Sequence, residues 1–391
     1  MSIQTKKYTS KKTKRMTTKY YAVVYSQIDN KPVWGPGRKS EREAKKDEAR
    51  LTEELESGRY ISRKLTFSEV ATQWLESAKV TYSDSTYRGY EYYYHKYIEN
   101  VFGDEYINNI QPIHIDKFKT EMLKMFSPET VNSMFTVLSD VFKYGITLHS
   151  NSNNPVRDIT RAKVPKRKYT TWDEEEISYF LSLDIVKASP YYDMFFISLM
   201  AAMRPSEVCG LTLDDFLPDK KIITVTQGLN QYGNISDLKN TSSHRSIALT
   251  DSMISMLNNR IIARKKLLLS GTSIDSNFIF VQHNGRFINP GVYSKNLRKL
   301  IKRHNNYVDK VMIEQGKLPD GMRHLKQIRL YDMRHSFATN TLTSKVPVKI
   351  VSEVMGHSKI QTTLDTYCHL KPVMHRETIN NYTEKITSRI S

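Results

Sequence analysis

The chain has 391 residues, and its 59 lysines and arginines against 41 aspartates and glutamates give a net charge of +18 and a pI near 9.5. This length predicts two to three domains at roughly 150 residues each, and so much positive charge indicates a polyanionic partner. A hydrophobic content of 39% excludes a wholly disordered basic protein. Two cysteines, Cys209 and Cys368, exclude a disulfide framework or a cysteine-based zinc site and favour a reducing compartment. No apolar run is long enough for a membrane span, and none follows the basic N-terminus as in a secretory signal.

The first 57 residues predict a basic tail followed by a small module. Residues 1–19 hold no acidic residue, so we expect a flexible tail that either keeps the chain soluble or contacts DNA. The candidate DNA contacts in it are Lys11, Lys12, Lys14 and Arg15. Residues 20–25 and 31–34 predict two strands, and Ser40 with Glu43 predicts a capped helix that ends near Glu56. The module over residues 20–57 is too small to be an enzyme.

Residues 64–150 predict a helical domain with an apolar core. Thr66 and Glu69 form a capping box, a tyrosine-rich helix follows, and Ser127-Pro128 begins the last helix. Residues 151–170 predict a basic linker, because asparagines and Pro155 end that helix. Its positive charge suits a protein that closes around a duplex, and its candidate DNA contacts are Arg161, Lys166, Arg167 and Lys168.

Residues 171–391 predict the largest unit, an α+β domain. Strands are expected at 221–226, 245–249 and 278–281, among helices of which the first is capped by Thr171 with Glu174. Apolar residues one or two turns apart predict a tail helix over residues 373–391 that docks on its own domain or on a neighbouring protomer. The chain as a whole is expected to be multidomain and mainly helical, with small β-sheets.

Four separated segments of this unit carry candidate functional side chains, and each also has an ordinary explanation. They are Arg204-Pro-Ser-Glu207 after an apolar helix, Lys239 in a polar turn, Tyr331-x-x-Arg334 in a helix, and Gly356-His357 followed by Tyr367. Taken alone, the first segment is explained by a surface ion pair and the second by a polar hairpin tip. The tyrosine of the last segment is explained by packing. Arg334 is less easily explained, because an arginine among apolar helix residues must be paired or bind an anion.

Together, the order and the residue sequences of these segments resemble those of the catalytic domain of the tyrosine recombinase (phage integrase) family. The family pattern is an arginine, a lysine in a hairpin, His-x-x-Arg, Gly-His, and a nucleophilic tyrosine about ten residues later. The resemblance covers residues 171–370, and the flanking sequence Met-Gly-His-Ser-Lys-Ile-Gln-Thr-Thr-Leu-Asp-Thr-Tyr shares it. Residues 64–150 resemble the family's core-DNA-binding domain, and residues 20–57 resemble its arm-DNA-binding domain. One position departs, since Tyr331 stands where the family usually has histidine, and His324 and His335 are out of register.

The resemblance implies phosphoryl transfer on DNA without a metal or other cofactor. Arg204 and Arg334 would hold the two nonbridging oxygens of the scissile phosphate, which gain negative charge during attack. Tyr367 would be the nucleophile that forms a 3′-phosphotyrosine bond, and Lys239 the general acid for the 5′-oxygen. His357 would hydrogen-bond the phosphate, Glu207 would orient the first arginine, and Tyr331 would donate a hydrogen bond.

The resemblance further implies double-stranded DNA with core and arm attachment sites as the partner, and a homotetramer that acts on it. It allows for an excisionase and a host DNA-bending protein, and it implies the cytoplasm and nucleoid of a bacterial host as the location, without a membrane. The expected function is integration and excision of a phage or conjugative element. A chromosome-dimer resolvase or invertase of the same family, and a noncatalytic DNA-binding regulator, are the alternatives.

Overall fold

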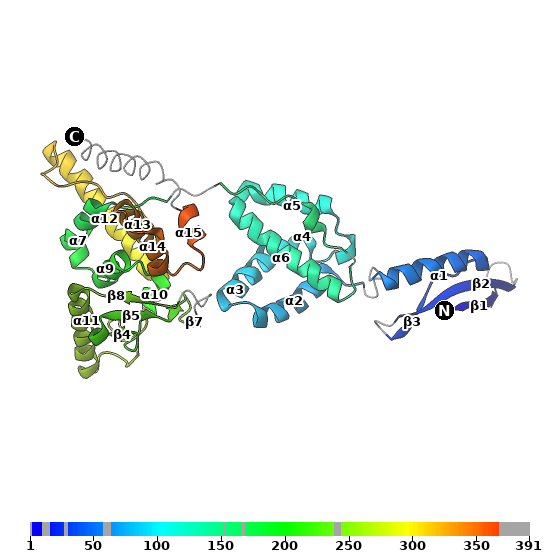
Figure 1. The fold of residues 1–391 in the computed structure, drawn as a ribbon. Coiled ribbons are helices and arrows are strands. Elements are labelled where there is room, and N and C mark those ends of the chain that lie inside the picture. Colours follow the sequence, from blue (N-terminus) through cyan, green and yellow to red (C-terminus); the bar gives the residue numbers. More distant parts are fainter. Residues whose placement is uncertain are drawn as a thin grey trace, which may run out of the picture. The chain divides into compact units, whose positions relative to one another are not determined.

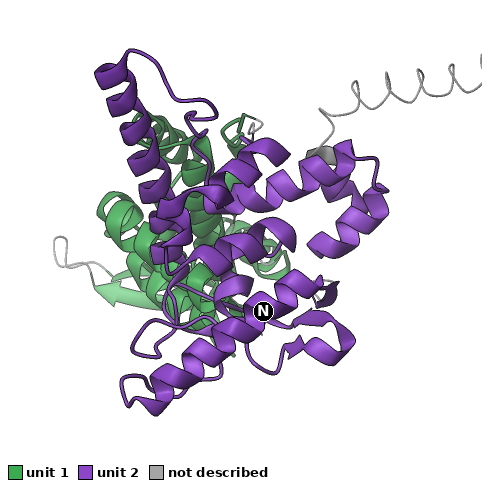
Figure 2. Cartoon of the chain, turned by 90° about the vertical axis from the view of Figure 1, so that its left-hand side faces the viewer, with its two compact units in different colours: residues 1–166 green, residues 167–391 purple. Residues whose placement is uncertain are grey.

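The computed structural model describes residues 2–9, 16–26, 30–57, 64–151, 153–165, 169–237 and 244–366. The chain divides into two compact units, residues 1–166 and 167–391 (Figure 2). As the sequence predicted, the described elements are mainly helices with small antiparallel sheets (Figure 1). Among these described residues, no helix combines the length and the apolar character that a bilayer span requires.

A three-stranded antiparallel sheet opens the first unit. Its strands are β1 (Ser2–Thr9), β2 (Met16–Ser26) and β3 (Lys31–Trp34), in the order β1-β2-β3, and helix α1 (Glu41–Glu56) packs against β2 (Figure 1). The Ser40 hydroxyl accepts a hydrogen bond from the Glu43 amide at 3.3 Å, which confirms the predicted cap. The buried core of this module is small and consists of Ala22, Val24, Val33 and Leu51.

The prediction of a flexible tail over residues 1–19 is wrong for those residues of this range that the structure describes. Ser2 pairs with Val23 and Thr9 with Met16, so that β1 is an edge strand of the sheet. Two threonines, Tyr8 and Ile3 are interspersed with the lysines, and these residue types favour strands. Ile3 also packs against the small core, so the module begins at Ser2 rather than at residue 20. Four expected DNA contacts, Lys11, Lys12, Lys14 and Arg15, lie outside the described residues.

The helical domain packs its helices around a second, larger core. The helices are α2 (Phe67–Thr81), α3 (Asp84–Tyr93), α4 (Glu99–Phe102), α5 (Pro112–Met125) and α6 (Pro128–Thr147). The predicted capping box is confirmed, since the Glu69 amide donates to Thr66 Oγ1 at 3.2 Å and the Thr66 amide donates to Glu69 Oε2 at 2.7 Å. A π-helical turn (Tyr94–Ile98) joins α3 to α4, and its Tyr94 is buried.

The segment after α6 was expected to be a linker, but its first part belongs to the helical domain. Asn154 is buried and donates to the Ser139 carbonyl at 3.2 Å, and a short 3-10 helix (Pro155–Asp158) follows. The Ala162 amide donates to Asn132 Oδ1 at 3.0 Å, and Arg161 donates to the Asn132 carbonyl at 2.6 Å. Asn154, which is buried, and Asn132, which is half-buried, bind backbone groups here, which composition alone did not reveal. Lys166, Arg167 and Lys168 lie outside the described residues.

In the second unit, most of the helices pack around a hydrophobic core to which two small sheets also contribute. The helices are α7 (Glu174–Ser182), α8 (Asp184–Lys187), α9 (Tyr192–Met200), α10 (Pro205–Cys209), α11 (Asp251–Leu269), α12 (Pro290–Gln315), α13 (Leu330–Thr343), α14 (Val348–Met355) and α15 (Ile360–Thr366). The strands are β4 (Phe216–Leu217), β5 (Ile222–Val225), β6 (Gln227–Leu229), β7 (Ile235–Asp237) and β8 (Arg245–Ala248). One antiparallel sheet has the order β4-β5-β8, and β6 pairs with β7 in a hairpin.

Two local predictions in this unit are wrong. Asp173, not Thr171, caps α7, because its side chain and backbone amide exchange hydrogen bonds with Glu176 at 2.8 and 3.1 Å. Residues 278–281 form no strand; Phe278 and Val281 make only isolated bridges, to Thr212 and Phe287. The apolar run there instead fills the core, where Ile279 and Phe280 are fully buried. Residues 373–391, where a tail helix was expected, lie outside the described part of the chain.

Candidate active site

Arg204 stands where the chain leaves a buried helix. Helix α9 is apolar and ends at Met200, and Ala202 adopts a left-handed conformation (φ +50°) that reverses the chain. Arg204 then caps α10, with Pro205 at the first helical position. Its amide donates to Glu207 Oε2 at 2.8 Å and its Nη1 donates to Oε1 at 2.5 Å. One glutamate therefore fixes both the backbone and the guanidinium of Arg204.

Glu207 is buried between two arginines. Its side chain is inaccessible to solvent, and the Arg245 guanidinium donates to Oε2 at 2.8 Å and to Oε1 at 3.2 Å. Burial acts to raise the pKa of Glu207, but the hydrogen bonds and charge of Arg245 and the charge of Arg204 hold this pKa below its usual value. Removing one partner of such a buried pair typically lowers the stability of the fold by about 3–5 kcal/mol, because a buried charge is left uncompensated.

Arg334 is the most deeply buried of the arginines. It lies in α13, is 1% exposed, and donates through Nη1 to the Ala202 carbonyl at 2.6 Å and through Nη2 to the Met355 carbonyl. Its Nε is buried without a partner among the described residues. Burial, and then the charge of Arg204, lower the pKa of Arg334 to about 10, so the guanidinium is protonated at neutral pH.

The C-terminal end of α14 brings the three arginines together. Its last carbonyl groups have no partner within the helix and carry partial negative charge. Three consecutive carbonyls accept hydrogen bonds from three different arginines: Val354 from Arg245 Nε at 2.6 Å, Met355 from Arg334, and Gly356 from Arg204 at 3.5 Å. The end of this helix therefore sets the spacing of the guanidinium groups.

His357 follows directly, because Gly356 ends α14 in the left-handed conformation (φ +63°). The His357 ring is half-buried, and its Nδ1 lies 2.8 Å from the buried hydroxyl of Thr363 in α15. Burial and the neighbouring positive charges of Arg334 and Arg204 lower the pKa of His357 to about 4. The ring is therefore neutral at pH 7 and can present its other nitrogen to a ligand.

Tyr331 lies in the first turn of α13 and is 40% exposed. Burial acts to lower the pKa of Arg204, but Glu207 and, after it, the Tyr331 hydroxyl hold this pKa above its usual value. The Tyr331 ring packs against His335 at 5.4 Å between centroids, and the Tyr169 ring packs against the same histidine at 4.0 Å in a tilted arrangement. The tyrosine thus faces the same guanidinium as Glu207 does.

The structure brings five of the sequence-predicted residues together: Arg204, Glu207, Tyr331, Arg334 and His357. Lys239, between β7 and β8, and Tyr367, which directly follows α15, lie outside the described residues. Arg161 belongs to the first unit.

Arg245 is the residue that the sequence analysis missed. The sequence signal that could have found Arg245 is the strand pattern. Residues two apart on a strand share a face, so Arg245 lies on the same face as Ile247, which is buried.

The cluster of Arg204, Glu207, Arg245, Arg334 and His357, here called the arginine cluster, is suited to binding an anion. The cluster holds three guanidinium groups and one buried carboxylate, which leaves two positive charges. Planar, permanently charged guanidinium groups match the oxygens of a phosphate. Preorganised charge of this kind stabilises a transition state in which negative charge develops on a phosphate.

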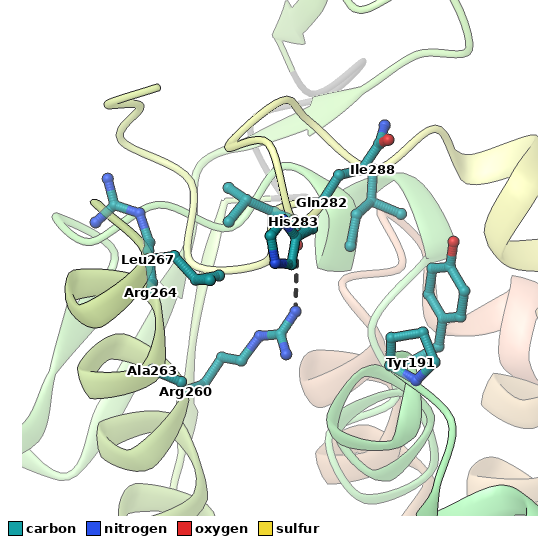
Figure 3. Close-up of a pocket in the computed structure, with 10 residues that line it drawn as sticks. Tyr191, Arg260, Ala263, Arg264, Leu267, Gln282, His283 and Ile288 are labelled. Atoms are coloured by element: carbon teal, nitrogen blue, oxygen red, sulfur yellow. Dashed lines mark hydrogen bonds between the residues drawn. The ribbon is translucent and has the colours of Figure 1, made fainter. Parts of the chain in front are cut away.

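A separate cavity of about 360 Å³ lies beside α11 (Figure 3). Tyr191, Ile288 and residues of α11 line it, and the Arg260 guanidinium donates to the Val281 carbonyl at 3.2 Å. Arg264, also on its wall, is 7% exposed and pairs with Asp275 at 2.9 Å and with the Ser276 carbonyl. None of the lining residues belongs to the arginine cluster.

The fold and the arginine cluster together define a DNA-cleaving and rejoining enzyme of the tyrosine recombinase class. The chain belongs to the phage integrase family, which it matches over residues 171–373, and residues 66–123 match the family's N-terminal SAM-like domain. It is 22% identical to the ICEBs1 integrase of Bacillus subtilis (strain 168) over 349 residues, which cover 88% of this chain and 89% of that protein.

Solved structures share the fold. The Tn1549 transposon integrase bound to transposon right end DNA superimposes with a TM-score of 0.65 at 21% identity, over 81% of this chain and 99% of that one. A lambda integrase tetramer bound to a Holliday junction superimposes with a TM-score of 0.55 at 13% identity, over 88% of this chain and 92% of that one. The recombinase fold expected from the sequence is confirmed.

Proposed function

We propose that this chain is the integrase of a mobile DNA element, phage or conjugative, which cuts and rejoins DNA through a 3′-phosphotyrosine intermediate. The observation that carries the proposal is the arginine cluster, in which Arg204, Arg334 and His357 converge from three separate elements. Membership of the phage integrase family, and similarity to an integrase from Bacillus subtilis and to a transposon integrase, support the reaction and the biological role.

In the proposed reaction, the Tyr367 oxygen attacks the scissile phosphorus and forms the phosphotyrosine bond while the bond to the 5′-oxygen breaks. Arg204 and Arg334 hold the two nonbridging oxygens as their charge grows, and Lys239 gives a proton to the leaving 5′-oxygen. Attack on the phosphotyrosine by the 5′-hydroxyl of another strand reverses the step and rejoins the DNA. Covalent storage of the phosphate thus separates cleavage from rejoining.

The neutral state of His357 fits a hydrogen-bonding role. When the Thr363 hydroxyl donates to Nδ1, the Nε2–H group of His357 is left as a donor toward a phosphate oxygen. The Tyr331 hydroxyl, which interacts electrostatically with Arg204, offers a second donor. These two donors add hydrogen bonds to the phosphate, and the neutral His357 ring adds no further charge to the crowded guanidinium groups.

We further propose that the helical domain binds core DNA and that the N-terminal sheet module binds arm DNA in a tetrameric complex. The net charge of +18 and the lysines exposed on β1 support DNA contact, and the lambda integrase tetramer on a Holliday junction supports the assembly. An excisionase and a host DNA-bending protein would set direction on the bacterial nucleoid. The proposed DNA contacts at Arg161, Lys166, Arg167 and Lys168 lie at the end of the first unit and the start of the second.

The reaction is tested with a nicked suicide substrate, which releases a short strand after cleavage and traps the covalent intermediate. The full-length protein should form a protein–DNA adduct that survives denaturation. Tyr367→Phe removes the nucleophilic oxygen and should form no adduct while binding the same DNA normally. An adduct with the Phe variant would place the nucleophile elsewhere, and no adduct with the unaltered protein would favour a noncatalytic regulator.

A further inference from the structure

Arg245 joins two parts of the active site that are far apart in the sequence. It is the first residue of β8, its side chain is 6% exposed, and α14 packs beside this strand. Through Nη1 and Nη2 it binds both oxygens of Glu207, and through Nε it binds the Val354 carbonyl in the last turn of α14. One planar side chain therefore contacts the α10 start and the α14 end at once.

The contact with Glu207 bears directly on Arg204. Glu207 uses the same two oxygens for Arg204, so its orientation is set by both arginines. Without Arg245, the buried carboxylate would have one charged partner and would be free to rotate toward it. Arg204, whose side chain is 25% exposed, would then lose its fixed direction.

The contact with α14 bears on His357. Gly356 lies against the Arg245 side chain, since a Cβ at this position would sit 3.0 Å from Arg245 Cδ and 3.1 Å from Nη1. The turn that leads to His357 thus closes on the arginine itself. Lysine at position 245 would keep the positive charge, but it lacks the planar fork that reaches two carboxylate oxygens and a carbonyl together.

We propose that Arg245 is a positioning residue of the recombination reaction, which holds Glu207 and the end of α14 so that Arg204 and His357 meet the scissile phosphate. The inference rests on the proposed function. Arg245 contacts no reacting atom; it acts through the residues that do. A displacement of about 1 Å in a catalytic group can cost about 10²-fold in rate, which sets the size of the effect expected here.

The test compares Arg245→Lys with a matched control, Arg264→Lys, in the full-length protein. Arg264 is also a buried arginine with one carboxylate and one backbone carbonyl as partners, but it lies beside the cavity of Figure 3. In single-turnover reactions on a nicked suicide substrate, Arg245→Lys should slow adduct formation by about 10²-fold and change core-DNA affinity by less than about threefold. Arg264→Lys should lose about as much thermal stability as Arg245→Lys does, but it should leave the rate of adduct formation unchanged.

A methylphosphonate at the scissile position separates positioning from general support of the fold. This substrate carries no negative charge on the phosphate, so it depends less on well-placed guanidinium groups. The rate loss of Arg245→Lys should shrink by about tenfold or more on it, whereas a purely structural defect would give the same loss on both substrates. If Arg245→Lys does not fold, Arg245→Gln, which can still donate to Glu207, is subjected to the same comparison.

An unchanged adduct rate in the Arg245 variant, or equal losses on the two substrates, would overturn the inference. Absence of any adduct with the unaltered protein would instead overturn the proposed function, so the two failures are distinguishable.

Discussion

The arginines of the cluster differ in how far they are fixed before DNA arrives. Arg334 is 1% exposed and held by two carbonyls, whereas the Arg204 side chain is 25% exposed and keeps one edge toward solvent. We therefore expect Arg204 to meet the phosphate first. The Nε of Arg334, which has no partner among the described residues, gives this guanidinium an unused donor. A buried donor without a hydrogen bond costs free energy, and a small shift on DNA binding would give this donor a partner.

Tyr331 supplies a prediction at the same scale. Its hydroxyl interacts electrostatically with Arg204, and loss of one donor to a developing oxyanion typically costs about 10²–10³ in rate. Tyr331→Phe should therefore slow single-turnover cleavage of a suicide substrate, up to this limit, without abolishing it. Tyr331→His restores the residue usual in the family and should retain activity. A Phe variant that cleaves at the normal rate would leave Tyr331 as a packing partner of His335.

The sequence predicted the site as far as its motifs reached. Arg204, Glu207, Arg334 and His357 were found because their spacing resembles a family pattern, and the structure brings them together. Arg245 was missed, because it binds a carboxylate and a backbone carbonyl whose proximity depends on tertiary packing. The proposed roles of Lys239 and Tyr367 stay predictions, since both residues lie outside the described part of the chain.

At the scale of elements, local signals predicted helix starts well. The caps at Ser40, Thr66 and Ser127 are all confirmed, because a cap depends on residues only three positions apart. Strands were harder to predict. The basic composition of residues 1–19 concealed β1, whose pairing with β2 needs a partner seven or more residues away. Hydrogen bonds made by Asn132 and Asn154 join the expected linker to α6.

The N-terminal sheet module gives the prediction at this scale. Its small core is separate from the core of the helical domain, and the arginine cluster lies beyond residue 200. Deleting residues 1–57 should therefore spare cleavage of a minimal core site in the suicide-substrate assay. It should abolish recombination of a substrate that needs distal arm sites. If arm-dependent recombination survives the deletion, the assignment of this module to arm DNA is wrong.

At the scale of the whole molecule, the charge of +18 governs how affinity responds to salt. Each DNA phosphate that the protein neutralises contributes about −0.9 to the slope of log K against log salt. We expect a steep slope for the full chain on arm-plus-core DNA. Without residues 1–57, the slope should become shallower by about 0.9 for each phosphate that these residues neutralise. Filter binding or fluorescence anisotropy at about 50–200 mM salt measures both slopes, in the range where such effects are large. Equal slopes for the two proteins would mean that the module binds no phosphate.

The end of α14 has a consequence for how this site tolerates change. Because the three arginines bind main-chain carbonyls at Val354, Met355 and Gly356, those hydrogen bonds do not depend on the side chains at the first two positions. A substitution there leaves every acceptor in place, so far as the apolar packing permits. Insertion or deletion of a single residue would instead rotate the carbonyls by about 100°, given about 3.6 residues per turn, and present each arginine with the wrong acceptor. The active site therefore depends more on the length of this segment than on the identity of its residues.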